Sequence, residues 1–244
     1  MVEICCGSYA DALAAWRGGA PRIELNSALA LGGLTPSEST LRLVKQHTGL
    51  RVVCMVRPRG AGFCYTETET EQMFAEAEAL LAQGSDGIAF GFLTEQHTVD
   101  EACTRRMVEL IHAHGGEAVF HRAFDCAADL DEAMQVLLRL GVDRVLTSGG
   151  QPTAPQGAER LRALHSAYGD RIALLAGSGV HAGNVRALME RTGVGQVHSS
   201  CKAWQTDPTT RGAQVDYSIA PAPHEMDYDI VSEDLVRKLV AQAL

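Results

Sequence analysis

Several features that define common protein classes are missing from this sequence of 244 residues. It has no dense run of Lys or Arg, and its formal net charge is −9. Because phosphate contacts need a clustered basic surface, we expect neither nucleic acid nor an anionic membrane as its partner. No run of 18 apolar residues and no basic leader occur, which predicts a cytoplasmic protein outside the membrane. No linker or low-complexity tract divides the chain, so we expect a single domain over residues 1–244.

The cysteines lack the spacing of a disulfide framework or a zinc site. Their number is odd, seven, and neither a Cys-x-x-Cys nor a His-x-x-x-His pattern is present. Scattered cysteines of this kind are typical of reduced thiols in the cytosol. The seven are Cys5, Cys6, Cys54, Cys64, Cys103, Cys126 and Cys201.

What the sequence does contain is an alternation of short β-rich segments with longer segments of helical period. Met73, Ala77, Leu80 and Leu81, for example, recur at i, i+4, i+7 and i+8, the stripe of an amphipathic helix. Eight strand-and-helix units of similar length predict an α/β fold, a single-domain TIM (β/α)8-type barrel, with any site at the C-terminal strand ends. We expect the strands at 2–6, 21–26, 51–56, 86–90, 117–121, 143–147, 171–176 and 194–198.

Helix starts are predicted where Thr is followed by Glu three positions later, the pattern of a capping box. The three pairs are Thr35/Glu38, Thr66/Glu69 and Thr98/Glu101. One irregular stretch, 201–230, contains three prolines and is predicted to form a long loop over the barrel mouth. A final helix is expected at 231–242.

Polar residues on the strands are the candidates for chemistry. Because side chains alternate along a strand, Glu3 and Cys5 share one face of the first strand, and Glu24 and Asn26 share one face of the second. Glu3 and Glu24 are candidate general bases, and His121 is a candidate general acid or base. The competing interpretation is a structural ion-pair network inside the barrel, because a buried charge must be paired.

Candidate anion-binding groups follow several strands. Arg57 and Arg59 end the third strand and are suited to hold an anion. Glycine- and serine-bearing loops follow strands six, seven and eight; such loops bind phosphate in many barrels, although their glycines also suit tight turns. A barrel enzyme that acts on a small anionic or phosphorylated metabolite by acid–base chemistry is therefore one hypothesis. The loop residues are Ser148, Gly177, Ser178, Gly179, Ser199 and Ser200.

Binding of a metal ion, Cu(I), is the other hypothesis. Cu(I) prefers soft ligands such as thiolates. Cys5 is expected to point into the barrel, with Cys201 reaching from the last loop, whereas Cys6 and Cys54 are expected to face the helices. The competing interpretation is that these cysteines serve as small apolar residues.

A set of short motifs runs in a fixed order from residue 2 to about residue 205. They are Glu3-Ile4-Cys5, Arg22-Ile23-Glu24-Leu25, Gly32-Gly33-Leu34-Thr35-Pro36-Ser37, Arg57-Pro58-Arg59-Gly60, Phe63-Cys64-Tyr65, His121-Arg122-Ala123-Phe124-Asp125, Arg144-Val145-Leu146-Thr147-Ser148-Gly149 and His198-Ser199-Ser200. In this combination the chain resembles the CutC family, which is named for a proposed role in copper homeostasis.

The resemblance implies a barrel fold, a cytoplasmic location, a link to copper and a homodimer or larger homo-oligomer. It implies a copper ligand at Cys5 and a second cysteine at the end of the second strand, where this chain has Asn26. Because an amide is a poor ligand for Cu(I), Cys5 is the one metal ligand that the resemblance predicts. The resemblance assigns no particular reaction to the chain and leaves both hypotheses open.

Overall fold

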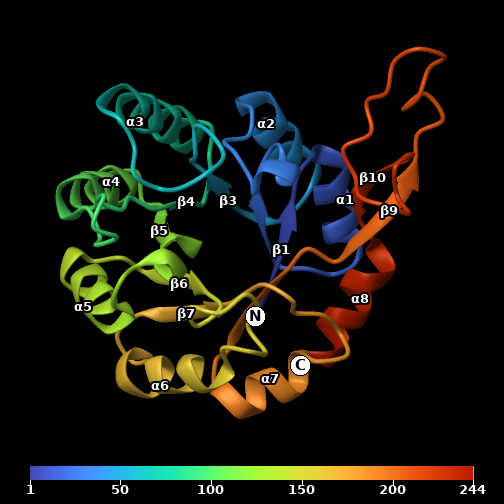
Figure 1. Ribbon diagram of the computed structural model, residues 1–244. Coiled ribbons are helices and arrows are strands. Elements are labelled where there is room, and N and C mark those ends of the chain that lie inside the picture. Colours follow the sequence, from blue (N-terminus) through green and yellow to red (C-terminus); the bar gives the residue numbers. More distant parts are fainter. Residues whose placement is uncertain (244) are drawn as a thin grey trace.

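Eight parallel strands close into a barrel in the computed structural model, which describes residues 1–243 (Figure 1). The strands follow one another in chain order, and β8 pairs with β1 to close the barrel. This confirms the predicted TIM (β/α)8-type barrel and all eight predicted strands. The strands are β1 (Val2–Cys6), β2 (Arg22–Leu25), β3 (Arg51–Met55), β4 (Gly87–Phe90), β5 (Glu117–Phe120), β6 (Arg144–Thr147), β7 (Ala173–Ala176) and β8 (Gln196–Ser199).

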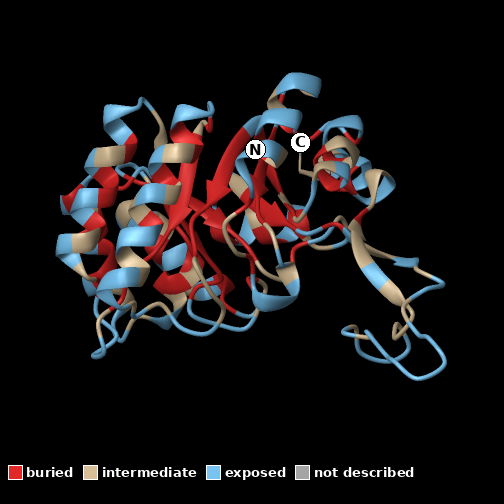
Figure 2. Ribbon diagram, turned by 90° about the horizontal axis from the view of Figure 1, so that it is seen from above, coloured by how far each residue is buried: buried red, intermediate tan, exposed pale blue. Residues whose placement is uncertain are grey.

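Within residues 1–243, eight α-helices surround the barrel, and Figure 2 shows buried residues in the strands and on the inward helix faces. The predicted stripe of the third helix is confirmed, since Met73, Ala77, Leu80 and Leu81 are all buried. No helix within residues 1–243 is long and apolar enough to cross a membrane. The helices are α1 (Tyr9–Arg17), α2 (Glu38–His47), α3 (Glu67–Ala82), α4 (Glu101–Ala113), α5 (Leu130–Leu140), α6 (Ala158–Tyr168), α7 (Val185–Thr192) and α8 (Glu233–Gln242), with short 3-10 helices at Leu29–Leu31 and Arg122–Cys126.

The predicted helix starts are partly wrong. Thr66 caps α3 through the capping box that the sequence predicts. The caps of α2 and α4, however, are Ser37 and Asp100, two residues beyond the predicted Thr35 and Thr98. Instead, the Thr35 hydroxyl contacts the Arg57 carbonyl and the Glu76 carboxylate of α3, and the Thr98 hydroxyl bonds to that of Thr94. For α2 and α4 the sequence spacing therefore predicted the helix but not the residue at which it begins.

The stretch 201–230 differs from the loop that the sequence predicts. It contains β9 (Lys202–Thr206) and β10 (Asp227–Val231), which pair antiparallel. Residues 202–231 form an arm that projects away from the barrel, rather than covering its mouth (Figures 1 and 2). The base of the arm is tied to α1, because the Val231 backbone N–H donates to Asp11 Oδ1 at 2.8 Å. Pairing gives backbone N–H and C=O groups of both segments hydrogen-bond partners, which water would have to supply in an irregular loop.

Candidate functional site

The C-terminal strand ends surround a cavity of about 580 Å³, where catalytic and binding residues of this fold usually lie. Apolar side chains supply much of its wall, including Met55, Phe63, Leu146, Val180 and Leu235. A few ionisable side chains also face it, among them Cys5, Glu24, Arg57, His121 and His198. A mostly apolar wall with a few converging polar groups is typical of a binding site.

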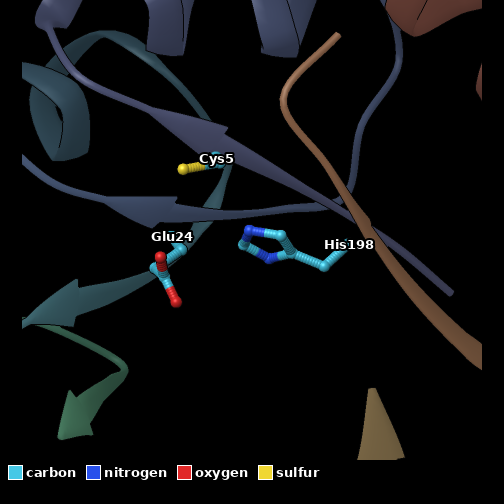
Figure 3. Close-up of side chains that lie close together, drawn as sticks. All are labelled: Cys5, Glu24 and His198. Carbon is cyan, nitrogen blue, oxygen red and sulfur yellow. The ribbon is translucent and has the colours of Figure 1, made fainter. Parts of the chain in front are cut away.

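Cys5, Glu24 and His198 converge in this cavity from three neighbouring strands (Figure 3). The Cys5 Sγ, a Glu24 carboxylate oxygen and a His198 ring nitrogen all lie within 4.8 Å of one another. Barrel closure produces this arrangement, since β1 lies between β2 and β8, with Cys5 paired to Glu24 and Glu3 paired to His198 in register. The cluster offers a thiol, an imidazole and a carboxylate, all of which are metal ligands.

His198 is oriented by the buried carboxylate of Glu3. The His198 Nδ1–H donates to Glu3 Oε1 at 2.9 Å, while Glu3 Oε2 lies 2.5 Å from Arg22 Nε and 3.7 Å from Arg144 Nη2. Burial alone would raise the pKa of Glu3, but the His198 hydrogen bond and the charges of His198 and both arginines lower this pKa to about 2. Glu3 is therefore an ionised member of a buried ion-pair network, which is the alternative that the sequence analysis set beside a catalytic base.

The three clustered groups influence one another's protonation. Burial raises the pKa of Glu24, and burial also raises the pKa of the Cys5 thiol although His198 opposes this shift. Burial alone would lower the pKa of His198, but Cys5, Glu24 and Glu3 together raise it well above its usual value. At neutral pH the cluster therefore contains a protonated thiol and an imidazolium. A metal ion would displace both protons on binding.

Asn26 lies beside the cluster, at the position where the sequence resemblance implies a second cysteine. Its Nδ2 donates to Glu24 Oε1 at 3.0 Å and lies 3.6 Å from Cys5 Sγ. Its Oδ1 packs against Gly33, where an added Cβ would lie only 2.4 Å away and where φ is +87°. An added Cβ at position 33 would therefore force the Asn26 side chain to shift, and the positive φ there also favours glycine. Asn26 acts as a hydrogen-bond donor within the cluster.

His121 lies on another part of the cavity wall. Its Nδ1 accepts from the Ala123 backbone N–H at 3.1 Å, so a neutral ring carries its proton on Nε2. Burial, followed by the charge of Arg57, lowers the pKa of His121 to about 3. The buried Nε2 has no hydrogen-bond partner among residues 1–243. His121 is therefore a neutral donor at physiological pH, not the base that the sequence proposed as one role.

The two candidate arginines mainly hold loops in place. Arg57 Nη1 donates to the carbonyls of Leu31 and Gly33, at 3.1 and 3.3 Å, and its Nη2 donates to that of Ala61, while its buried Nε has no partner in the described chain. Arg59 forms an ion pair with Glu69 and does not line the cavity. Of the two, only Arg57 lines the cavity.

Only some of the glycine and serine residues that were predicted to bind an anion line the cavity. Ser178, Gly179, Ser199 and Ser200 line the cavity, whereas Gly177 and Ser148 do not. The backbone N–H and hydroxyl of Ser148 both donate to Asp125 at 3.0 Å. Asp125 therefore already accepts from the Ser148 donors, which do not face the cavity.

His198 is the site residue whose role the sequence analysis missed, since it assigned this segment only to an anion-binding loop. Its side chain reaches the cluster because β8 is the neighbour of β1 in a closed barrel. The signal was available, because alternation from Gln196 places His198 on the inward face of β8. Applying barrel closure to the predicted strands would have brought it beside Glu3.

This fold and site define a TIM barrel that has a half-buried cysteine beside a buried histidine and a buried glutamate at its mouth. The model of the CutC family matches residues 1–203, and the chain belongs to this family. A CutC family protein of Treponema denticola is 40% identical over 240 residues, which cover 98% of this chain and 97% of the relative. One of Citrobacter koseri is 43% identical over 209 residues, covering 85% and 82%.

Solved structures agree with this assignment. A structure of CutC from Streptococcus agalactiae, described as a proposed copper homeostasis protein, has a TM-score of 0.77 and 28% identity. The match covers 82% of this chain and 98% of that one. A phosphoribosylanthranilate isomerase from Pyrococcus furiosus, with a TM-score of 0.56 and 14% identity, covers 100% of this chain and 98% of that one and shares the fold alone.

Proposed function

We propose that this CutC family protein binds Cu(I) as its cargo at Cys5 and His198, in the service of copper homeostasis. The single observation that carries the proposal is the convergence of the Cys5 thiol and the His198 imidazole within 4.8 Å. A separation of this size suits an ion between them, since metal–sulfur and metal–nitrogen bonds are about 2.3 and about 2.0 Å long. The description of the Streptococcus agalactiae relative supports copper as the ion.

The hydrogen bond from His198 to Glu3 supports a ligand role for the other ring nitrogen. Metal-binding histidines commonly donate their second N–H to a carboxylate, which orients the ring and increases its basicity. Here Nδ1 makes that bond, so Nε2 is left for the ion. Arg22 and Arg144 keep the Glu3 carboxylate ionised and in place.

The donor chemistry favours Cu(I) over harder ions, because a thiolate is a soft ligand. Cys201 also lines the cavity, but it lies outside the cluster and its Sγ is 3.7 Å from the Ser199 hydroxyl. Asn26 supplies no thiolate. The site therefore has a single soft ligand and should hold Cu(I) less tightly than a site with two thiolates.

Anaerobic titration of the protein with Cu(I) against a chromogenic chelator tests this proposal. We expect one ion per chain, with binding lost in both Cys5→Ser and His198→Ala. Cys201→Ser is the matched control, because it removes a thiol from the same cavity but not from the cluster, and it should bind normally. Unchanged Cu(I) affinity in Cys5→Ser would rule the proposal out.

We also propose that the protein is a cytoplasmic homo-oligomer. All seven cysteines are free thiols, which supports a reducing compartment. The arm exposes Val215, Tyr217 and Ile219, whose relative exposures are 56%, 77% and 82%, and large exposed apolar side chains support a contact with another chain. Light scattering should report an oligomer that dissociates in Tyr217→Ser/Ile219→Ser. A monomeric wild-type protein would contradict this part of the proposal.

A further inference from the structure

The clustered side chains offer a bound Cu(I) ion only one soft ligand. Cys5 supplies a sulfur and His198 a ring nitrogen, whereas Glu24 supplies a carboxylate oxygen, which is a hard ligand. The Glu24 Oε1 also accepts a hydrogen bond from Asn26 Nδ2 at 3.0 Å. Because Cu(I) is selected by thiolates and thioethers, an ion held by Cys5 and His198 alone lacks a second soft ligand.

Two other sulfur-bearing side chains line the cavity in the described part of the chain, and both have contacts of their own. Cys201 is not among the groups that lie within 4.8 Å of one another, and its Sγ lies 3.7 Å from the Ser199 hydroxyl. Met55 is 5% exposed and packs with Val53 and Ala89 in a small apolar cluster. The second soft ligand is therefore expected from outside the chain.

The cavity provides the space for such a ligand. Cys5, Glu24 and His198 all line it, and Cys5 is only half-buried. Its volume of about 580 Å³ is much larger than an ion requires and lies in the range of pockets that bind small organic molecules, about 300–1,000 Å³. A small molecule in this cavity can therefore contact an ion at the cluster directly.

We propose that Cu(I) is bound here together with a low-molecular-weight thiol, whose sulfur is the second soft ligand beside Cys5 and His198. This inference rests on the proposed copper site and deepens it by naming the species that carries the ion. The ion enters as a complex with two such thiolates, and its bond to Cys5 Sγ forms as its bond to one of them breaks. The departing thiolate takes the proton of Cys5, the proton of His198 passes to solvent, and the copper remains Cu(I) throughout.

Anaerobic equilibrium dialysis of the protein against Cu(I) and radiolabelled glutathione, used as the probe thiol, tests this inference. Wild-type protein should bind one Cu(I) and one glutathione per chain, and X-ray absorption should show two sulfur ligands and one nitrogen ligand. S-methylglutathione is the matched probe, because it has the same body but no thiol, and the protein should not bind it. Metal-free protein should not bind glutathione, because the ion links the thiol to the site.

Variants distinguish this thiol from the sulfurs of the chain, and the wild-type dialysis decides the matter if a variant fails to fold. The double variant Met55→Leu/Cys201→Ser removes both other sulfurs of the cavity wall and should bind glutathione as the wild type does. Asn26→Cys, which adds a thiol beside Cys5, should bind at least about twofold less glutathione per Cu(I) than Asn26→Ser. Cu(I) bound without glutathione would overturn this inference alone, whereas a protein that binds no Cu(I) would overturn the copper site as well.

Discussion

The Nδ1 of His198 lies 2.9 Å from Oε1 of Glu3, across the line where β8 closes against β1. This one contact connects two systems. On one side Glu3 is ion-paired with Arg22 and Arg144 in the barrel interior, and on the other His198 belongs to the cluster with Cys5. The network that stabilises the barrel and the proposed metal site therefore share Glu3, and a change there should affect both.

Glu3→Gln should reduce both stability and Cu(I) affinity. The substitution leaves Arg22 and Arg144 buried with a neutral partner, which should cost about 3–5 kcal/mol of unfolding free energy. It also weakens the orientation of His198, which should lower Cu(I) affinity about 10–100-fold. Glu117→Gln is the control, because Glu117 pairs with Arg144 at 3.0 Å but is not among the groups that contact His198. Chemical denaturation and Cu(I) titration should show that Glu117→Gln loses stability but keeps its Cu(I) affinity.

Cu(I) binding should tighten as the pH rises. The pKa values of Cys5 and His198 are both raised, so both groups carry a proton at neutral pH that the ion must displace. With about two protons released per ion, the association constant should rise about 100-fold per pH unit below both pKa values. Competitor titrations at several pH values measure this slope. An affinity independent of pH would show that these two groups are not the ligands.

Asn26→Cys should strengthen Cu(I) binding by about tenfold or more, because it adds a second soft ligand. The Asn26 side chain already reaches within 3.6 Å of Cys5 Sγ, so a thiolate at this position lies near the first. Asn26→Ser is the control, since it shortens the side chain equally but adds only a hard oxygen. Equal affinities in the two variants would contradict the assignment of Cys5 as a ligand.

Gly33→Ala should destabilise the protein more than Gly84→Ala. Both glycines have a left-handed backbone, with φ of +87° and +89°, so both substitutions should cost about 1–2 kcal/mol in backbone strain. An added Cβ meets nothing within 4 Å at Gly84, but at Gly33 it would lie 2.4 Å from Asn26 Oδ1. Thermal unfolding of the two variants isolates the Asn26 contact. Equal losses of stability in the two variants would show that the Asn26 side chain moves away from the added methyl group at no cost.

His121 should make the protein sensitive to mild acid. The pKa of this imidazole falls to about 3 on folding, through burial and the facing charge of Arg57. His121 therefore takes up a proton below about pH 6.5 in the unfolded chain but not in the folded chain. As the pH falls, this difference lowers the free energy of unfolding by up to about 1.4 kcal/mol per pH unit. Glu24 and His198, whose pKa values are raised in the folded protein, act in the opposite direction, so the contribution of His121 is the difference between two proteins. Denaturation between about pH 6.5 and about pH 5 should show that the wild type loses more stability on acidification than His121→Asn does.

The sequence predicted the barrel because its signals are local. Each strand is a short β-rich run bounded by turn residues, and each helix shows its own apolar stripe, as Met73 to Leu81 do. The pairing of β9 with β10 was missed because its partners, such as Lys202 and Val231, lie about thirty positions apart and carry no local turn signal. The first residues of α2 and α4 were predicted wrongly because Glu76 of α3 and the Thr94 hydroxyl bind the hydroxyls of Thr35 and Thr98.

The sequence by itself determined the barrel, the inward position of Cys5 and the absence of a second cysteine at Asn26, because strand alternation and residue identity are properties of the chain alone. The tertiary structure decided what those residues contact. Only barrel closure brings His198, near the end of the chain, to Glu3 near its beginning. Only burial makes Glu3 an ionised structural partner and His121 a neutral donor, since protonation depends on neighbouring charges and solvent, not on residue type.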